Sequence, residues 1–375
     1  MSSNVNLGSS ASLPDAPRGP QKVAEDCWMV GHRNPESMLQ CNTYIRTFRQ
    51  FGSARNVCID PGSQFDFSVV ESNVSKVIGD MSEVHAMTIN HQDPDVAGNA
   101  PLFCEAAPHL EMIVSEEVWR LLQHMMLQPG RVRLSHGTQS TTTQQPFQFV
   151  PTPFCHFRGA MALYDPEQRI LYSGDLFGGL NQLGRVQLLA EENDWAGIAQ
   201  FHQIYMPSRE VLRYAVRQIL NLRPKVEVIA PQHGHIITGE LVDLFLERMH
   251  ELLVGNDLLA EDWDSENRSA YQEVLQRVVD LAMEERGEVN VVGRLNTHET
   301  QDDLASQVRL RGRELLLDRE GYSSLGKVFL RLTEGEQEDF INALRRVVAK
   351  SCEEFGLPIP PVASGFRREL ASEAS

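Results

Sequence analysis

The fold is decided by the stretch His91-Gln-Asp93-Pro-Asp95-Val96 and the short apolar run Ala86-Met-Thr-Ile89 that precedes it. The apolar run is typical of a buried β-strand. In a loop that leaves a strand, a histidine and two aspartates at every second position can converge on one side. Pro94 stiffens this turn, which reduces the entropy lost on ordering it. The motif predicts a polar or metal-binding site at a strand end, although Asp-Pro-Asp alone is also common turn chemistry.

Three more polar residues lie beside β-like runs downstream. His156 precedes one such run, Asp175 ends Tyr172-Ser-Gly-Asp, and His233 ends Pro231-Gln-His. Each is close to glycine or proline, and glycine permits the tight backbone that a crowded site needs. A buried aspartate after a strand costs free energy unless it is paired or bound to metal. We therefore expect one shared site, built from His91, Asp93, Asp95, His156, Asp175 and His233.

Strand-like and helical segments alternate along residues 26–253, which predicts an α/β fold. Ser115 and Ser208 are expected to be helix N-caps. Beyond residue 258 the helical pattern dominates, and Thr333-Glu-Gly-Glu336 is expected to open a helix as a capping box. Periodicity does not decide whether the runs 314–317 and 327–332 are strands or buried helical turns. The predicted organisation is a disordered leader (1–24), a domain carrying the site (25–257), a helix-rich module (258–362) and a tail (363–375).

Composition narrows the classes of partner. The formal net charge of −17 over 375 residues argues against nucleic acid or an anionic membrane, because either would repel the chain. The sequence has no run of about 18 apolar residues, so we expect no membrane span. Six widely spaced cysteines predict reduced core thiols in a cytoplasmic protein.

The ordered set of polar residues resembles the metallo-β-lactamase superfamily, and more closely the flavodiiron proteins and their relatives without a flavodoxin domain, the oxygen-binding di-iron proteins. The phrases Cys58-Ile-Asp-Pro-Gly62 and Tyr172-Ser-Gly-Asp-Leu-Phe177 support the resemblance, which covers residues 26–255. It implies an αββα sandwich that binds two iron ions.

The resemblance also implies a role for each residue of the site. His91, Asp93 and His156 would hold one iron, Asp95 and His233 the other, and Asp175 would bridge them.

This sequence departs from the family pattern at Val96, where the family usually has a histidine. The second metal then lacks a ligand, and His85, His202 and His235 are candidates to replace it. His235 is interpreted instead as a residue beside the site or an exposed one. Tyr205 and His202 are candidates to donate hydrogen bonds to a bound oxygen species, with core packing as the alternative for both.

Three aspartates favour iron, although zinc and manganese stay open. The resemblance implies a protein that binds or reduces dioxygen or nitric oxide. As a reductase it would need an external electron donor, since residues 256–375 contain no loop of the kind that cradles FMN. As an oxygen sensor it would signal through residues 258–362, which could also serve a homo-oligomer. The runner-up is a metal-dependent hydrolase of phosphodiesterase or lactonase type, in which Asp95 orients the attacking water. A degenerate, structural site is the last hypothesis.

Overall fold

The computed structural model describes residues 15–360 and 363, apart from positions 18, 51, 126, 136–146, 260, 297–303 and 319–320. Its first sheet has seven strands in sequential order. They are β1 (Gln21–Ala24), β2 (Cys27–Met29), β3 (Tyr44–Gln50), β4 (Ser53–Ile59), β5 (Val84–Thr88), β6 (Glu111–Val114) and β7 (Arg131–Leu134). Strands β1 to β4 pair antiparallel, and β4 to β7 pair in parallel.

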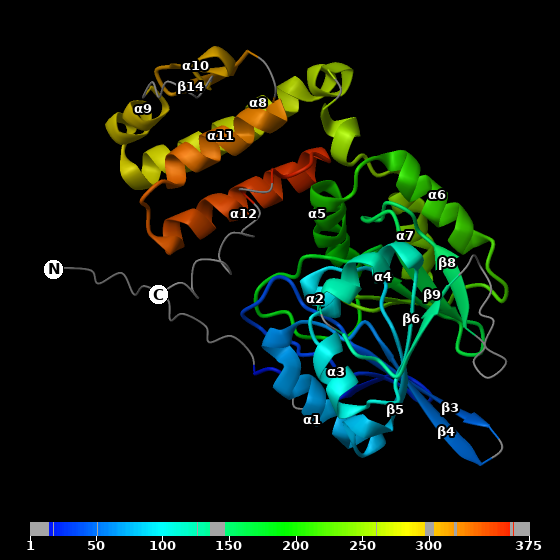
Figure 1. Cartoon of the computed structure of the whole chain (residues 1–375). Coiled ribbons are helices and arrows are strands. Elements are labelled where there is room, and N and C mark those ends of the chain that lie inside the picture. The colour runs from blue at the N-terminus through cyan, green and yellow to red at the C-terminus, as the bar shows by residue number, and fades with distance from the viewer. Residues whose placement is uncertain are drawn as a thin grey trace.

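Parallel pairing requires crossover connections, which helices supply here. They are α1 (Phe67–Ile78), α2 (Pro94–Ala97), α3 (Ala100–Ala106) and α4 (Glu116–Leu122). The helices cover the outer face of the first sheet, where Val70, Phe103 and Val118 join strand residues in one hydrophobic cluster. Figure 1 shows α1 and α3 outside this sheet.

The second sheet has five strands in the order β12-β11-β10-β9-β8. They are β8 (Gln148–Pro151), β9 (Met161–Asp165), β10 (Ile170–Gly174), β11 (Val228–Pro231) and β12 (Ile237–Thr238). Strands β10 and β11 are parallel, so both lead toward the same sheet edge. The helices on this side are α5 (Trp195–Tyr205), α6 (Arg209–Leu220) and α7 (Glu240–Glu251), which pack on the sheet through a second cluster.

A third hydrophobic cluster fills the space between the two sheets. It joins Tyr44 and Phe48 of the first sheet to Leu163 and Tyr172 of the second. A buried ion pair spans the same interface, because Arg46 Nε on β3 lies 2.7 Å from Asp165 Oδ2 on β9. The layers are helix, sheet, sheet and helix, which confirms the predicted αββα sandwich.

Residues after 259 form helices and one small hairpin. The elements are α8 (Glu261–Arg286), α9 (Glu288–Asn296), α10 (Leu304–Gln307), β13 (Val308–Arg311), β14 (Glu314–Leu317), α11 (Gly321–Thr333) and α12 (Glu338–Phe355). They share a hydrophobic cluster drawn from residues 270–363 alone. Helices α8, α11 and α12 run alongside one another in Figure 1.

Several local predictions are confirmed. Ser115 caps α4, where its hydroxyl accepts a hydrogen bond from the Val118 amide. Ser208 occupies the N-cap position of α6, but its side chain makes no capping bond. Of the two ambiguous runs, residues 314–317 form strand β14 and residues 327–332 lie within helix α11. All six cysteines are buried free thiols.

Two predictions are wrong. The Thr333 capping box does not open a helix, because Thr333 is the last residue of α11 and its hydroxyl donates to the Phe329 carbonyl. Gly335 then adopts a φ of +68°, which interrupts the helical backbone, and α12 begins only at Glu338. The expected leader also extends too far, since Gln21–Ala24 forms β1 by pairing with β2.

The expected leader up to residue 14 and the expected tail from residue 364 lie outside the described residues. Ala363 packs in the C-terminal cluster. Among the helices that the structure describes, none has the length and hydropathy to cross a membrane.

Candidate metal centre

The loop after β5 positions the first three polar residues. His91 is buried, and its Nδ1 lies 3.2 Å from Asn90 Oδ1, which directs Nε2 into the site. Asp93 is the N-cap residue of α2 and Asp95 lies in the first turn of this helix. The proline between them occupies the first helical position, where proline is favoured because its missing N–H has no partner to lose.

The other three predicted residues lie in loops of the second sheet. His156 lies in the β8–β9 loop, Asp175 directly follows β10, and His233 follows β11 after the single residue Gln232. His233 Nδ1 donates to the Gln40 carbonyl at 2.8 Å, which leaves Nε2 to face the site. Because β10 and β11 are parallel neighbours, their carboxyl ends bring Asp175 and His233 together.

The first group of side chains is His91, Asp93 and His156. Their ligand atoms lie within 4.8 Å of one another. The Asp93 Oδ2 atom is 3.1 Å from His156 Nε2 and 3.7 Å from His91 Nε2. A carboxylate and two imidazoles in this arrangement can hold one metal ion.

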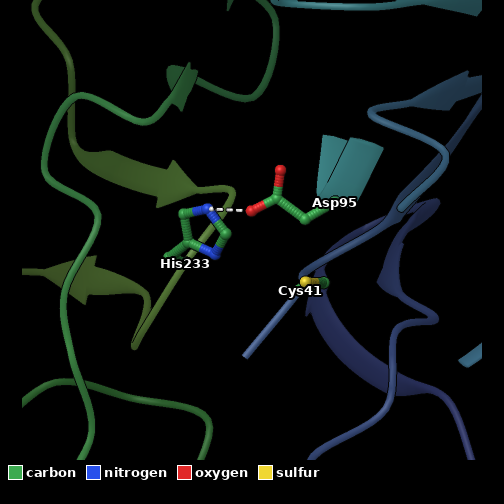
Figure 2. Close-up of side chains that lie close together, drawn as sticks. All are labelled: Cys41, Asp95 and His233. Atoms are coloured by element: carbon green, nitrogen blue, oxygen red, sulfur yellow. Dashed lines mark ion pairs between the residues drawn. The ribbon is translucent and has the colours of Figure 1, made fainter. Parts of the chain in front are cut away.

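The second group is Cys41, Asp95 and His233, whose ligand atoms also lie within 4.8 Å of one another. Figure 2 shows these side chains, with an ion pair of 3.3 Å between His233 Nε2 and Asp95 Oδ2. Cys41 is not among the residues predicted from the sequence, and it enters from the loop before β3.

Asp175 lies between the two groups. Its Oδ2 is 3.3 Å from His91 Nε2 and 3.1 Å from His156 Nε2, whereas its Oδ1 is 3.5 Å from His233 Nε2. The side chain is buried, and Oδ1 has no hydrogen-bond partner among the described residues. An unpaired buried carboxylate oxygen is costly unless a cation lies beside it. The donor set therefore fits two metal ions that share Asp175.

The charges of the site are strongly coupled. Burial acts to lower the pKa of His156, but hydrogen bonds with Asp175 and Asp93 raise it to about 10. Burial also opposes protonation of His233, yet its hydrogen bond with Asp95 holds its pKa well above the usual value. Burial acts to raise the pKa of Asp175, and the surrounding imidazoles hold it well below its usual range. Without metal, protonated histidines thus balance the charge of the aspartates, as metal ions would.

Close packing of Gly174 against the Asn90 side chain holds the centre in place. Gly174 precedes Asp175 with a φ of +60°, and a Cβ at this position would lie 2.0 Å from Asn90 Cγ. Asn90 in turn donates through Nδ2 to the Met161 carbonyl and contacts His91 through Oδ1. Only glycine at position 174 lets these two strand ends approach so closely.

Helix α5 forms an aromatic wall beside both groups. The Tyr205 ring lies 5.7 Å from the His156 ring, and the Phe201 ring lies 5.2 Å from the His233 ring. His202 on the same helix is fully buried, and both of its ring nitrogens are engaged. Its Nδ1 donates to the Ile198 carbonyl, and its Nε2 accepts from the Phe177 amide at 3.0 Å. His202 therefore fastens the loop that carries Asp175.

Two histidines that could have replaced the missing ligand at position 96, His85 and His235, lie outside the candidate metal centre. Val96 itself is fully buried in the hydrophobic cluster of the first sheet. His85 lies near the opposite end of β5 from His91, and its Nδ1 accepts from the Asn56 amide. His235 is buried rather than exposed, with its Nδ1 2.8 Å from Arg33 Nη2. Neither of these two histidines belongs to the groups that converge on Asp175.

Comparisons with known proteins identify the family and the fold of this chain. A family model described as ODP family beta lactamase matches residues 39–234. The solved apo state of the chemotaxis sensor ODP from T. denticola is 26% identical, with a TM-score of 0.54; the match covers 65% of this chain and 97% of that chain.

Two curated sequences are also similar. Type A flavoprotein fprA of Rhodobacter capsulatus is 25% identical over 265 residues, which is 66% of this chain and 58% of the relative. A nitric oxide reductase of Moorella thermoacetica is 22% identical over 169 residues, which is 43% of this chain and 42% of the relative. The chain thus spans about half the length of these curated relatives. Because the family model covers more than half of the sequence, and the sandwich carries the site at its strand ends, this chain belongs to the ODP family of metallo-β-lactamase-like proteins.

Proposed function

We propose that this chain binds two iron ions and uses them to bind dioxygen. His91, Asp93 and His156 hold one iron, Asp95 and His233 hold the other, and Asp175 bridges them. The observation that carries this assignment is the orientation of Asp175, whose two carboxylate oxygens face different groups. An aspartate that served one metal only would not need to lie between both.

The donor set favours iron over zinc. Three aspartates contribute a charge of −3, and carboxylates are hard oxygen donors that suit iron or manganese. Two ferrous ions carry a charge of +4, so the centre is close to neutral without many added hydroxides. When bound, a ferrous pair supplies electrons to dioxygen, whereas zinc could only polarise water.

The surrounding residues would shape the pocket for a small ligand. Phe201 and Tyr205 lie one helical turn apart on α5, so one face of this helix borders both groups. The Phe201 ring would exclude water beside His233. Tyr205 would donate a hydrogen bond to a ligand bound near His156. His202 acts on the site only through the Phe177 amide, because neither of its nitrogens is available to a ligand.

Sensing is the form of this function that we favour. The described residues after 259 form helices and a two-stranded hairpin, whereas a flavodoxin requires a doubly wound parallel sheet. We propose that this segment transmits the state of the metal centre to a partner. Reduction of dioxygen or nitric oxide with an external donor is the second candidate, because the curated relatives include a nitric oxide reductase.

Oxygen exposure after anaerobic loading with ferrous iron tests the proposal. We expect the absorption spectrum to change on mixing with dioxygen, and oxygen uptake to stop at an amount comparable to the protein. Continued uptake with an artificial electron donor would favour the reductase. A silent spectrum, together with anaerobic cleavage of a phosphodiester or lactone in the presence of zinc or manganese, would contradict the proposal and favour a hydrolase.

A further inference from the structure

The two groups around Asp175 are unequal if Cys41 is left aside. The first contains two imidazoles and one carboxylate, and the second contains one imidazole and one carboxylate. Asp175 adds one oxygen to each. The first metal thus has four protein ligands and the second has three. Position 96 does not fill the gap, because Val96 is packed in a hydrophobic cluster.

Cys41 differs from the other five cysteines. Each of those belongs to a hydrophobic cluster of the described structure; they are Cys27, Cys58, Cys104, Cys155 and Cys352. Cys41 is buried but belongs to none of these clusters. Its Sγ lies instead within 4.8 Å of ligand atoms of Asp95 and His233. Burial raises the pKa of the Cys41 thiol, so the thiol would lose its proton only as a metal ion binds.

The residues on both sides of Cys41 are tied to the loop that carries His233. The Gln40 carbonyl accepts from His233 Nδ1, and the Asn42 amide donates to the Gln232 carbonyl at 2.6 Å. The Asn42 side chain also donates to the carbonyls of Pro231 and Gly234, each at 3.0 Å. Cys41 is therefore held opposite His233 by hydrogen bonds that do not involve its own side chain.

A second observation, an unpaired carboxylate oxygen, points to a bound cation on the same side. Asp175 Oδ1, which is buried and has no hydrogen-bond partner among the described residues, faces His233. We propose that Cys41 is the fourth protein ligand of the second metal ion, which it binds as a thiolate together with Asp95, His233 and Asp175. This inference rests on the proposed two-metal function. On binding, a sulfur–metal bond forms, the S–H bond breaks, and its proton passes to solvent. Iron accepts cysteine thiolates in several other protein sites.

Cobalt(II) is a suitable probe because its bonds to thiolate give intense near-ultraviolet charge-transfer absorption. Protein freed of metal would be titrated anaerobically with cobalt while absorption and bound metal are recorded. We expect two cobalt ions per chain, with the thiolate band appearing as one of them binds. The matched variants are Cys41→Ser and Cys104→Ser, since Cys104 is also buried but lies in the hydrophobic cluster of the first sheet.

The Cys41→Ser variant should lose the band and bind the second cobalt at least about tenfold more weakly, because even outer residues of metal sites contribute 10- to 100-fold. Cys104→Ser should keep both the band and the affinity. Two bound cobalt ions without a thiolate band in the unmodified protein would overturn the inference while leaving the two-metal proposal intact. This spectrum does not depend on the folding of any variant. Failure to bind two metal ions of any kind would overturn both.

Discussion

Replacing Asp175 with asparagine changes one atom and removes one negative charge from the middle of the site. The amide keeps the shape of the side chain, so the variant tests charge and bridging rather than packing. If Asp175 is shared, both metal positions should weaken together. Asp93→Asn and Asp95→Asn are matched controls, because each of these aspartates faces only one group.

The size of the effect follows from the distances around Asp175. A unit positive charge at 3.3 Å, the separation of His91 Nε2 from Asp175 Oδ2, is stabilised by about 5 kcal/mol at an effective dielectric constant of about 20. The distance to His233 is 3.5 Å, so the second group gains a similar amount. Water or hydroxide would replace part of this stabilisation. If a net loss of roughly 3 kcal/mol remains, each dissociation constant rises about a hundredfold.

Calorimetric titration of metal-free protein with ferrous iron, performed anaerobically, measures both affinities. We expect Asp175→Asn to weaken both positions, Asp93→Asn to weaken one, and Asp95→Asn to weaken the other. Circular dichroism would confirm that the variants are folded. Retention of one position at full affinity in Asp175→Asn would refute the bridging role.

Three other perturbations test the protonation of the site, the packing beside it and the buried ion pair between the two sheets. Because His156, with a pKa of about 10, is protonated at neutral pH in the metal-free protein, metal affinity should fall as the pH is lowered, and binding should release protons. Titration calorimetry in two buffers of different ionisation enthalpy measures that release; binding without it would contradict the coupling. Gly174→Ala should destabilise the fold by at least about 1 kcal/mol more than Gly312→Ala in thermal unfolding, since both glycines have a positive φ but only the first would collide with a neighbour. Arg46→Met should lower the free energy of unfolding by about 3–5 kcal/mol by leaving its buried carboxylate partner unpaired. Denaturant titration measures this loss. Arg169→Met removes an exposed ion pair and should change the free energy of unfolding little. Equal losses in the two variants would contradict the stabilising role of the buried pair.

The site was predictable from the sequence where its residues follow strands. His91, Asp175 and His233 each follow a short apolar run, and the parallel pairing of β10 with β11 brings the last two together. The αββα architecture followed from the family resemblance that these residues carry.

Cys41 could not be found in the same way. It precedes the nearest predicted ligand by 50 positions, and its neighbours Gln40 and Asn42 form no metal-binding motif. Its place in the site comes from hydrogen bonds to the loop after β11, which are long-range contacts. A buried cysteine is also one of the commonest core residues, so its type alone gives no signal.

The C-terminal errors have a local cause. The Thr333-Glu-Gly-Glu336 sequence satisfies the capping-box pattern, but that pattern does not record whether a preceding helix already includes the threonine. In the structure Thr333 closes α11, and the glycine that follows takes a left-handed backbone. Periodicity likewise could not separate the strand at 314–317 from the helical run at 327–332, because both are short and apolar.

The central claim is a two-iron centre organised around Asp175, and elemental analysis of protein purified without oxygen tests it most directly. We predict about two iron ions per chain for the unmodified protein, and far less than one for Asp175→Asn prepared in parallel. A single metal ion per chain that survives in the variant would contradict the shared centre. Stoichiometric zinc in place of iron would leave the geometry intact but contradict the proposed chemistry with dioxygen.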